Sequence, residues 1–134
     1  MIKPGVETLV SVALIAEVQA RMGASADDFL ITVGERIGAA CVFDFVGGLP
    51  QFAQTMNDMW DQLGLGAVEL SMRGGQLHIL HRVPQVGRDN IVWRDTLPFV
   101  VEGIYRSWFK ALGPHGVVSR AGSTGNDFEF LFSE

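Results

Sequence analysis

The sequence contains a single cysteine, Cys41, among its 134 residues. One cysteine excludes an internal disulfide and any metal site that needs several thiolates. Cys41 follows two alanines at the end of an apolar pattern, and no histidine lies near it in the sequence. We therefore expect an unreactive buried thiol at this position rather than a nucleophile.

Positive charge is also scarce. Ten Lys and Arg residues stand against fifteen Asp and Glu, which gives a net charge of −5, and the basic residues form no cluster. Nucleic acids and anionic membrane surfaces both bind clustered positive charge. Neither is therefore an expected partner.

No apolar run is long enough to span a bilayer. The segment LVSVALIAEVQA (9–20) has the apolar core of a signal peptide, but Glu7 interrupts its front and Glu17 and Arg21 follow at once. We interpret it as a mostly buried helix. Without a convincing signal peptide, and with a free cysteine, the cytoplasmic side is the favoured location, while a periplasmic location stays open.

Apolar side chains are abundant for so short a chain. Hydrophobic residues make up 48% of the sequence and charged residues only 19%. A monomer of this size would leave part of that apolar surface exposed, so self-association is expected.

The periodicity predicts one α+β domain over residues 1–134, with helices packed against a small antiparallel sheet. The chain length fits one domain. Three N-terminal helices come first, then a β-hairpin, a long helix and a C-terminal β-hairpin. The helices are expected over about 6–22, from Ser25 to about 40, from Pro50 to 63, and from Asp95 or Thr96 to Gly113. Pro98 is placed in the first turn of the long helix. Glu102 and Arg106 are expected to form an i,i+4 ion pair on the side of this helix opposite its apolar face.

Two hairpins are predicted from glycines between alternating segments. Gly74 and Gly75 separate the strands AVELSMR (67–73) and QLHILHRV (76–83). In the last hairpin AGSTGN (121–126) is predicted as the turn before DFEFLF.

The sequence offers no persuasive catalytic or metal-binding group. His78 and His81 are three residues apart on a predicted strand, so they point to opposite faces and could not bind one metal ion. No metal is expected, because no third ligand accompanies these histidines. No cofactor is expected either, since SMRGGQ (71–76) has too few glycines for a phosphate-binding loop. Trp60 and Trp108 are placed in the core, whereas Trp93, in a loop, could stack on a sugar ring.

Several motifs resemble the family of the bacterial cellulose synthase D subunit (BcsD). They occur in the order expected for that family: a helix ending at Leu63-Gly64, an alternating strand, the loop VPQVG, a later tryptophan, and the helix LPFVVEGIYRSW (97–108). VGERIG (33–38) resembles a further element upstream. The residues that carry the resemblance are Gly34, Gly38, Leu63, Gly64, Pro84, Gln85, Val86, Gly87, Trp93, Pro98, Glu102, Gly103, Tyr105 and Trp108.

The resemblance implies a non-catalytic accessory subunit of the cellulose synthesis and secretion machinery. Family members form a ring, an octamer built from dimers, whose inner passages are thought to guide nascent β-1,4-glucan chains. Polymerisation belongs to a separate membrane glycosyltransferase. The implied partners are other copies of the chain, the glucan and the other synthase subunits, with the protein beside the inner-membrane complex.

The resemblance also assigns roles to particular residues. By position alone, the N-terminal residues Met1, Ile2, Lys3, Pro4 and Gly5 would line the passage. Gly34, Gly38 and Gly103 would permit close helix contacts between subunits. In the connector, Pro84 and Gly87 shape a turn, Gln85 is expected to bond backbone, and Trp93 to anchor the start of the long helix.

Two other functions remain as alternatives. The first is a sensor module that binds a small molecule between the sheet and the long helix. The second, less favoured, is a carbohydrate-active enzyme, although nothing in the sequence selects a facing pair of carboxylates.

Overall fold

The computed structural model describes residues 6–41, 47–83, 91–110, 112–113, 115–124 and 127–133; within these, the side chains of 6–12, 24, 91–94, 123 and 124 are not described. The elements are α1 (Val6–Met22), a 3-10 turn η1 (Gly23–Ser25), α2 (Ala26–Ala40), α3 (Leu49–Leu63), β1 (Ala67–Arg73), β2 (Gln76–Arg82), α5 (Ile91–Phe109), β3 (Val117–Thr124) and β4 (Asp127–Ser133). The α+β class and the predicted order of elements are confirmed.

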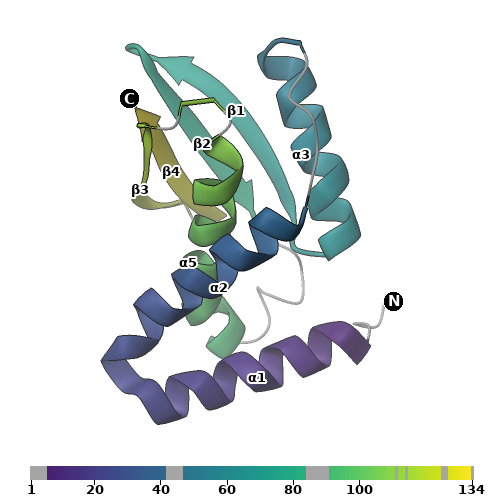
Figure 1. The fold of residues 1–134 in the computed structure, drawn as a ribbon, viewed down its shortest axis with the longest axis vertical. Coiled ribbons are helices and arrows are strands. Elements are labelled where there is room, and N and C mark those ends of the chain that lie inside the picture. Colours follow the sequence, from purple (N-terminus) through teal and green to yellow (C-terminus); the bar gives the residue numbers. More distant parts are fainter. Residues whose placement is uncertain are drawn as a thin grey trace.

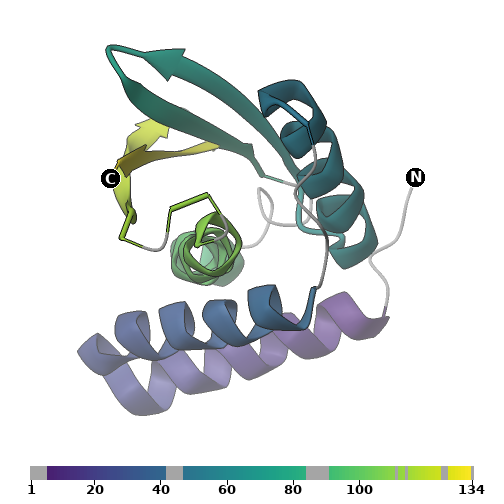
Figure 2. The ribbon, with the colours of Figure 1, turned by 45° about the horizontal axis from the view of Figure 1, so that its top comes forward.

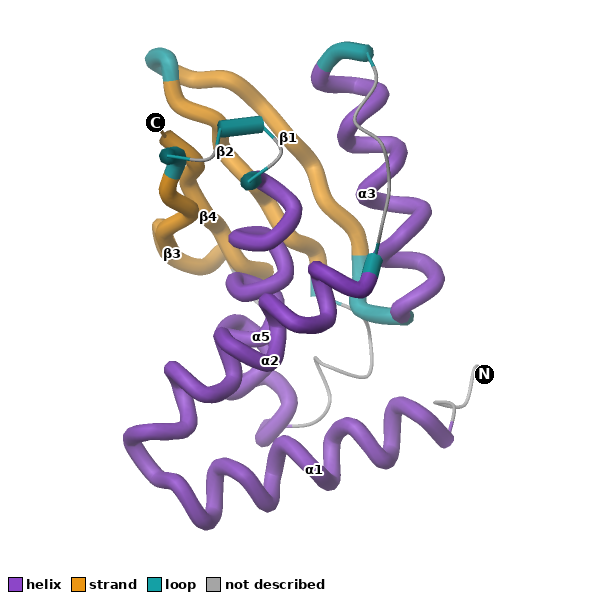
Figure 3. The backbone as a smooth tube through the Cα atoms, viewed as in Figure 1, coloured by secondary structure: helices purple, strands orange, loops and turns teal. Residues whose placement is uncertain are grey.

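The molecule is built in layers around α5. The four strands form one antiparallel sheet in the order β1-β2-β4-β3. Helix α5 lies against one face of this sheet, and α1 and α2 cover the other side of α5 (Figure 2). Helix α3 runs beside the edge strand β1 (Figures 1 and 3). Because α5 is covered on both sides, most of its described side chains are buried. The interpretation of 9–20 as a mostly buried helix was wrong: none of the described side chains of α1, residues 13–22, is buried, because α1 lies on the outside of the molecule (Figure 2).

The first hairpin forms as predicted. Gly74 and Gly75 have φ values of 57° and 81°, which suit a tight turn between β1 and β2. Along β2, Leu77, Ile79 and His81 are buried and alternate with more exposed residues. The predicted opposite orientation of His78 and His81 is therefore confirmed.

The predicted turn of the second hairpin was too long. Strand β3 continues through Ala121 to Thr124, where the sequence predicted a turn. The pairing of β3 with β4 shifts between Arg120 and Gly122, and Gly122 has a φ of 151°. A β-bulge therefore accommodates the small residues that suggested a turn.

The predicted start of the long helix was also wrong. Helix α5 begins at Ile91, before Asp95 and Thr96, so Pro98 lies inside it rather than in its first turn. A proline inside a helix removes one backbone hydrogen bond and costs about 3 kcal/mol. Pro98 and its neighbour Leu97 are buried, so tertiary packing opposes this local cost.

Helix α3 ends where the sequence predicted. Gly64 follows Leu63 with φ 68° and ψ 26°, a left-handed conformation that favours glycine. The N–H groups of Gly64 and Leu65 donate to the carbonyls of Asp61 and Trp60, each at 3.2 Å. The side chain of Leu63 packs against the core.

Helices α2 and α5 cross at glycines and touch through their backbones. A Cβ added to Gly34 would overlap the Val100 carbonyl, and one added to Gly103 would overlap the Ile31 carbonyl. A Cβ on Gly38 would lie 2.7 Å from the Ser107 Cβ. The close approach expected of Gly34, Gly38 and Gly103 is therefore real, but it lies within one chain and not between subunits, since the chain's own helices bury these positions.

Replacing the crossing glycines should weaken the fold sharply. We expect Gly34→Ala or Gly103→Ala to lower the free energy of unfolding by more than about 2 kcal/mol, because the added methyl must push two helix backbones apart. Urea unfolding followed by circular dichroism measures this loss. Gly64→Ala is the matched control: nothing lies within 4 Å of its added Cβ, and left-handed strain should cost only about 1 kcal/mol. Equal losses in all three variants would contradict the crossing as the cause.

Candidate functional site

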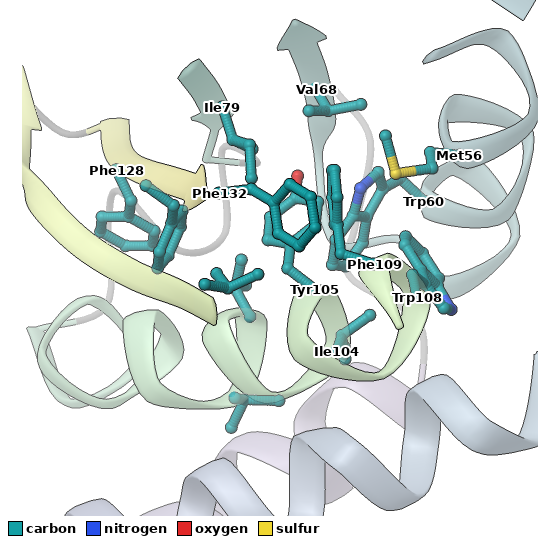
Figure 4. Packing of buried hydrophobic residues seen from close by; sticks show 14 of the residues in the cluster. Met56, Trp60, Val68, Ile79, Ile104, Tyr105, Trp108, Phe109, Phe128 and Phe132 are labelled. Atoms are coloured by element: carbon teal, nitrogen blue, oxygen red, sulfur yellow. The ribbon is translucent and has the colours of Figure 1, made fainter. Parts of the chain in front are cut away.

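Four of the residues that carry the resemblance, Glu102, Gly103, Tyr105 and Trp108, form the pattern EGxYxxW in α5, and they make their contacts on different sides of the helix. Gly103 and Trp108 contact α2, whereas Tyr105 lies among the aromatic residues beneath the sheet (Figure 4). All of these positions are buried, with Tyr105 fully so. The signature residues therefore lie inside the molecule, between α5 and the elements that pack on it.

Tyr105 is part of a buried hydrogen-bond chain that passes through His81. The Tyr105 hydroxyl lies 2.7 Å from Nδ1 of His81, and Nε2 of His81 lies 2.7 Å from the Leu65 carbonyl oxygen. A carbonyl only accepts, so Nε2 must carry the proton and donate to Leu65. Nδ1 then accepts from the Tyr105 hydroxyl. One neutral tautomer satisfies both nitrogens and links α5, β2 and the turn after α3.

Aromatic rings surround this chain. The Trp60 ring centroid lies 4.5 Å from that of His81, 5.2 Å from Tyr105 and 4.8 Å from Trp108, each in an edge-to-face arrangement. Phe128 stacks on the other side of His81 with an interplanar angle of 8°. Such contacts hold the imidazole in an apolar setting. The predicted core positions of Trp60 and Trp108 are confirmed.

Burial determines the protonation states of His81 and Tyr105, the two side chains of the buried hydrogen-bond chain. It lowers the pKa of His81 to about 4, although the Leu65 carbonyl and the charge of Asp127 act in the opposite direction. It raises the pKa of Tyr105 well above its usual range. The Trp60 N–H acts to lower the pKa of Tyr105, but it makes no hydrogen bond with good geometry. Burial therefore determines the direction of the shift for Tyr105. Both groups are neutral at pH 7, and both ring nitrogens of His81 are occupied.

Trp108 closes the end of α2. Its indole Nε1 donates to the Gly38 carbonyl at 3.2 Å, and the backbone N–H of Cys41 donates to the same oxygen at 3.2 Å. Carbonyls in the last turn of a helix lack partners within the helix. Trp108 therefore adds a donor from α5 to the one that Cys41 provides, at one of the α2 glycines that were expected to permit close helix contacts.

Glu102 and Arg106 form the predicted i,i+4 ion pair, with 2.7 Å between Oε2 and Nη2. However, the sequence placed this pair away from the apolar face, whereas Glu102 is only 6% exposed. Burial raises the pKa of Glu102, and the charges of Arg106 and Arg120 act against that rise. The guanidinium of Arg120 lies over the rings of Phe99 and Phe128, at 5.9 and 5.7 Å. Arg120 of β3 therefore contacts α5 through the ring of Phe99.

Two polar contacts were missed by the sequence reasoning. The Asn57 amide pairs with edge strand β1: its Nδ2 donates to the Val68 carbonyl at 3.1 Å, and its Oδ1 accepts from the Val68 N–H at 2.7 Å. Asp127 accepts from the Val83 N–H at 3.0 Å and pairs with Arg82 at 3.3 Å. Asn57 stood among the polar residues of α3, and nothing in the pattern separated it from solvent-facing neighbours.

Several predicted site residues lie outside the described part of the chain. These are Met1, Ile2, Lys3, Pro4, Gly5, Pro84, Gln85, Val86 and Gly87. The backbone of Trp93 lies in α5, contrary to the predicted loop, but its side chain is not described. The roles predicted for the passage segment, for Gln85 and for Trp93 therefore stay predictions.

The middle of the space between the sheet and α5, where the alternative sensor would have its pocket, is occupied by buried side chains, among them Tyr105, Phe109 and Phe132 (Figure 4). A hollow of about 290 Å³ lies at the margin of this space, between the end of α5 and the strands β3 and β4, and is lined by residues including Phe109, Val117 and Phe132. Another of about 290 Å³ lies on the sheet, lined by residues including Glu69, His78 and Glu129. Among the described residues, no three His, Cys, Asp or Glu side chains are grouped to hold a metal ion. No helix in the described ranges is long and apolar enough to cross a membrane.

Acid should destabilise the protein through His81. Its folded-state pKa of about 4 lies below the usual 6.5, so the unfolded chain binds more protons between these values. This histidine should therefore lower the free energy of unfolding by about 3 kcal/mol as the pH falls from 6.5 to 4. Urea titrations over this range measure the loss, and NMR should show a neutral imidazole in the native protein down to about pH 5.

His115→Gln is the control for this experiment, because His115 is exposed in the turn before β3. The free energy of unfolding of this variant should keep the wild-type dependence on pH.

Tyr105→Phe should lower the free energy of unfolding by about 1–3 kcal/mol at pH 7, since it leaves Nδ1 of His81 buried without a donor. A native His81 that titrates near pH 6.5 would contradict this account of the buried chain.

Comparison with known proteins places these features in a family. The family model for the cellulose synthase D subunit matches residues 6–129, which include every described helix and most of the sheet. No curated protein matches the chain closely enough to count as a relative. The match covers the crossing glycines of α2 and the EGxYxxW residues of α5. The chain therefore belongs to the family of the cellulose synthase D subunit, BcsD.

Proposed function

We propose that this protein is a non-catalytic accessory subunit of the cellulose synthesis and secretion machinery, which it joins as a single BcsD domain. It assembles with itself into a ring and guides nascent glucan chains for export and crystallisation. Its partners are other copies of itself, the β-1,4-glucan and the other synthase subunits. It works on the cytoplasmic side of the inner membrane, with the periplasmic side as the alternative.

The observation that carries this proposal is how the signature residues are used. Tyr105 satisfies His81, Trp108 caps α2 and Gly103 permits the helix crossing. Each is committed to a contact within the chain, and each is buried. Residues that hold a scaffold together in this way suit a protein whose surface, rather than an enclosed site, meets the polymer.

Exposed apolar side chains support self-assembly. Leu14, Met72 and Val117 are 63%, 58% and 60% exposed, and they come from α1, β1 and β3. Large apolar side chains left in water favour contacts with further copies or partners. A chain that passes glucan along must also bind sugar weakly, because a tight site would stall the moving polymer.

The proposal predicts a specific phenotype for removal of the gene. Crystalline cellulose should be lost or strongly reduced in cells, while synthase turnover measured in isolated membranes stays at the wild-type level. X-ray diffraction of the secreted polymer and incorporation of UDP-glucose measure the two quantities. Loss of turnover in the membranes would contradict an accessory role.

Removing residues 1–5 tests the passage itself. The shortened protein should keep the assembled mass of the wild type in light scattering, but it should fail to restore crystalline cellulose to the deletion strain. A protein with the same five positions replaced by Gly and Ser separates the length of this segment from its sequence. Hydrolysis of cello-oligosaccharides by the pure protein would instead favour an enzyme.

A further inference from the structure

The hollow of about 290 Å³ beside the end of α5 lies where α2, α5 and the strands β3 and β4 meet. The floor of this hollow is apolar. The rings of Phe109 and Phe132 lie there with their centroids 5.1 Å apart (Figure 4), and Val118 is buried opposite Phe132 in the sheet. Pockets for small ligands are about this size or larger and are lined mainly by such side chains. This corner can therefore hold the apolar part of a small molecule.

Gly116 and Val117 form the side of the hollow at the start of β3. A Cβ added to Gly116 would overlap the ring of Phe132, so a larger residue would have to displace the floor. Val117 follows with a side chain that is 60% exposed. The apolar floor is therefore reached from solvent at this side.

Three charged side chains line the same hollow, and only one of them is paired. Nη2 of Arg106 lies 2.7 Å from Oε2 of Glu102, whose side chain is only 8% exposed, so the guanidinium is held in place and its charge is balanced. Glu35, on α2, and Lys110, directly after α5, have no hydrogen-bond or ion-pair partner among the described residues. The hollow therefore has one free negative group and one free positive group, which come from different helices.

We propose that this hollow binds a small apolar zwitterion of about the size of an aromatic amino acid. The ammonium group of the ligand lies against Glu35, its carboxylate lies against Lys110, and its apolar body rests on Phe109 and Phe132. A guanidinium has five N–H donors, so Arg106 can also donate to the ligand carboxylate while Glu102 holds it. Hydrogen bonds between charged groups of this kind are about twice as strong as neutral ones.

The balance of charge argues against a ligand that is only an anion. The C-terminal end of α5 carries partial negative charge, and Glu35 adds a full negative charge to the hollow. Against these stand Lys110 and Arg106, and the charge of Arg106 is already balanced by Glu102. A ligand that is neutral overall but carries both charges therefore fits this hollow better than a ligand with one charge.

This site goes beyond the proposed function, because it needs neither the ring nor the glucan. It lies at the margin of the space between the sheet and the long helix. The ligand class follows from the free charges and the apolar floor alone.

Three probes that differ in charge test the site. L-Phenylalanine carries both charges, 3-phenylpropanoate lacks the ammonium group, and 2-phenylethylamine lacks the carboxylate. Calorimetric titration of the full chain at pH 7 and low salt should give L-phenylalanine a dissociation constant about tenfold lower than either relative, because each lost charge removes one charge-assisted contact. In NMR spectra, L-phenylalanine should shift the backbone amide signals of residues 116–118.

Variants of the two free charges should change the affinity for different probes. Glu35→Gln should weaken L-phenylalanine about tenfold without weakening 3-phenylpropanoate, and Lys110→Gln should weaken both by a similar factor without weakening 2-phenylethylamine. Arg73→Gln, at an exposed cation of β1, is the matched control and should bind all three probes as the wild type does. Gly116→Ala should weaken all three alike, because it displaces the floor. Circular dichroism confirms that each variant folds.

Two results would overturn the site. One is that none of the probes binds at millimolar concentration and the signals of 116–118 do not move. The other is that 3-phenylpropanoate binds as tightly as L-phenylalanine and Glu35→Gln changes neither, since the hollow would then take a plain anion. Either result leaves the ring standing, because the assembled mass in light scattering is measured without any probe. Conversely, a protein that binds L-phenylalanine as expected but does not assemble keeps this site and loses the ring.

Discussion

The backbone contact between α2 and α5 sets the position of the other layers. Glycines on both helices bring the two axes so close that Gly34 and Gly103 touch the opposite backbone. With α2 held there, Trp108 reaches the last turn of α2, and the other side of α5 is presented to the sheet. The aromatic cluster around Trp60 and the hydrogen-bond chain through His81 then fill the layer between α5 and the strands. A methyl group at the crossing would disturb all of these contacts together, because protein interiors transmit such displacements.

The sequence was sufficient to predict most helices and strands, but it did not predict most of the polar contacts between them. Periodicity gave α1, α2, α3 and the first hairpin because each has an apolar side and a terminal glycine or proline. It placed the start of α5 too late, since Pro98 is normal in a first turn and the packing that tolerates it deeper in the helix is not visible in the sequence. It missed the bulge in β3 for a similar reason: small residues that suit a turn also suit a bulge.

In the candidate site, the sequence placed single residues correctly but did not identify the residues that they contact. His81 could be placed on the inner side of β2 from its alternation with Leu77 and Ile79, yet its partners Tyr105 and Leu65 lie 24 and 16 residues away. Pairings at that separation depend on the assembled fold. The glycines were correctly expected to mark close contact, but a small-residue strip does not say whether its partner is in the same chain or another. Resemblance supplied the family, and the structure supplied a physical reason for Glu102, Gly103, Tyr105 and Trp108 of α5.

The central position of α5 has a practical consequence for finding where glucan binds. The helix with the most recognisable sequence is also the one whose described side chains, 95–109, are mostly buried. The residues that identify the family are therefore not the ones that a passing polymer can contact. Mutagenesis guided by the signature would collect folding defects and mistake them for lost polymer handling. A scan that begins instead from the least distinctive exposed positions, on the outer side of the sheet and around the hollow near His78, samples the surface that a passing chain can touch.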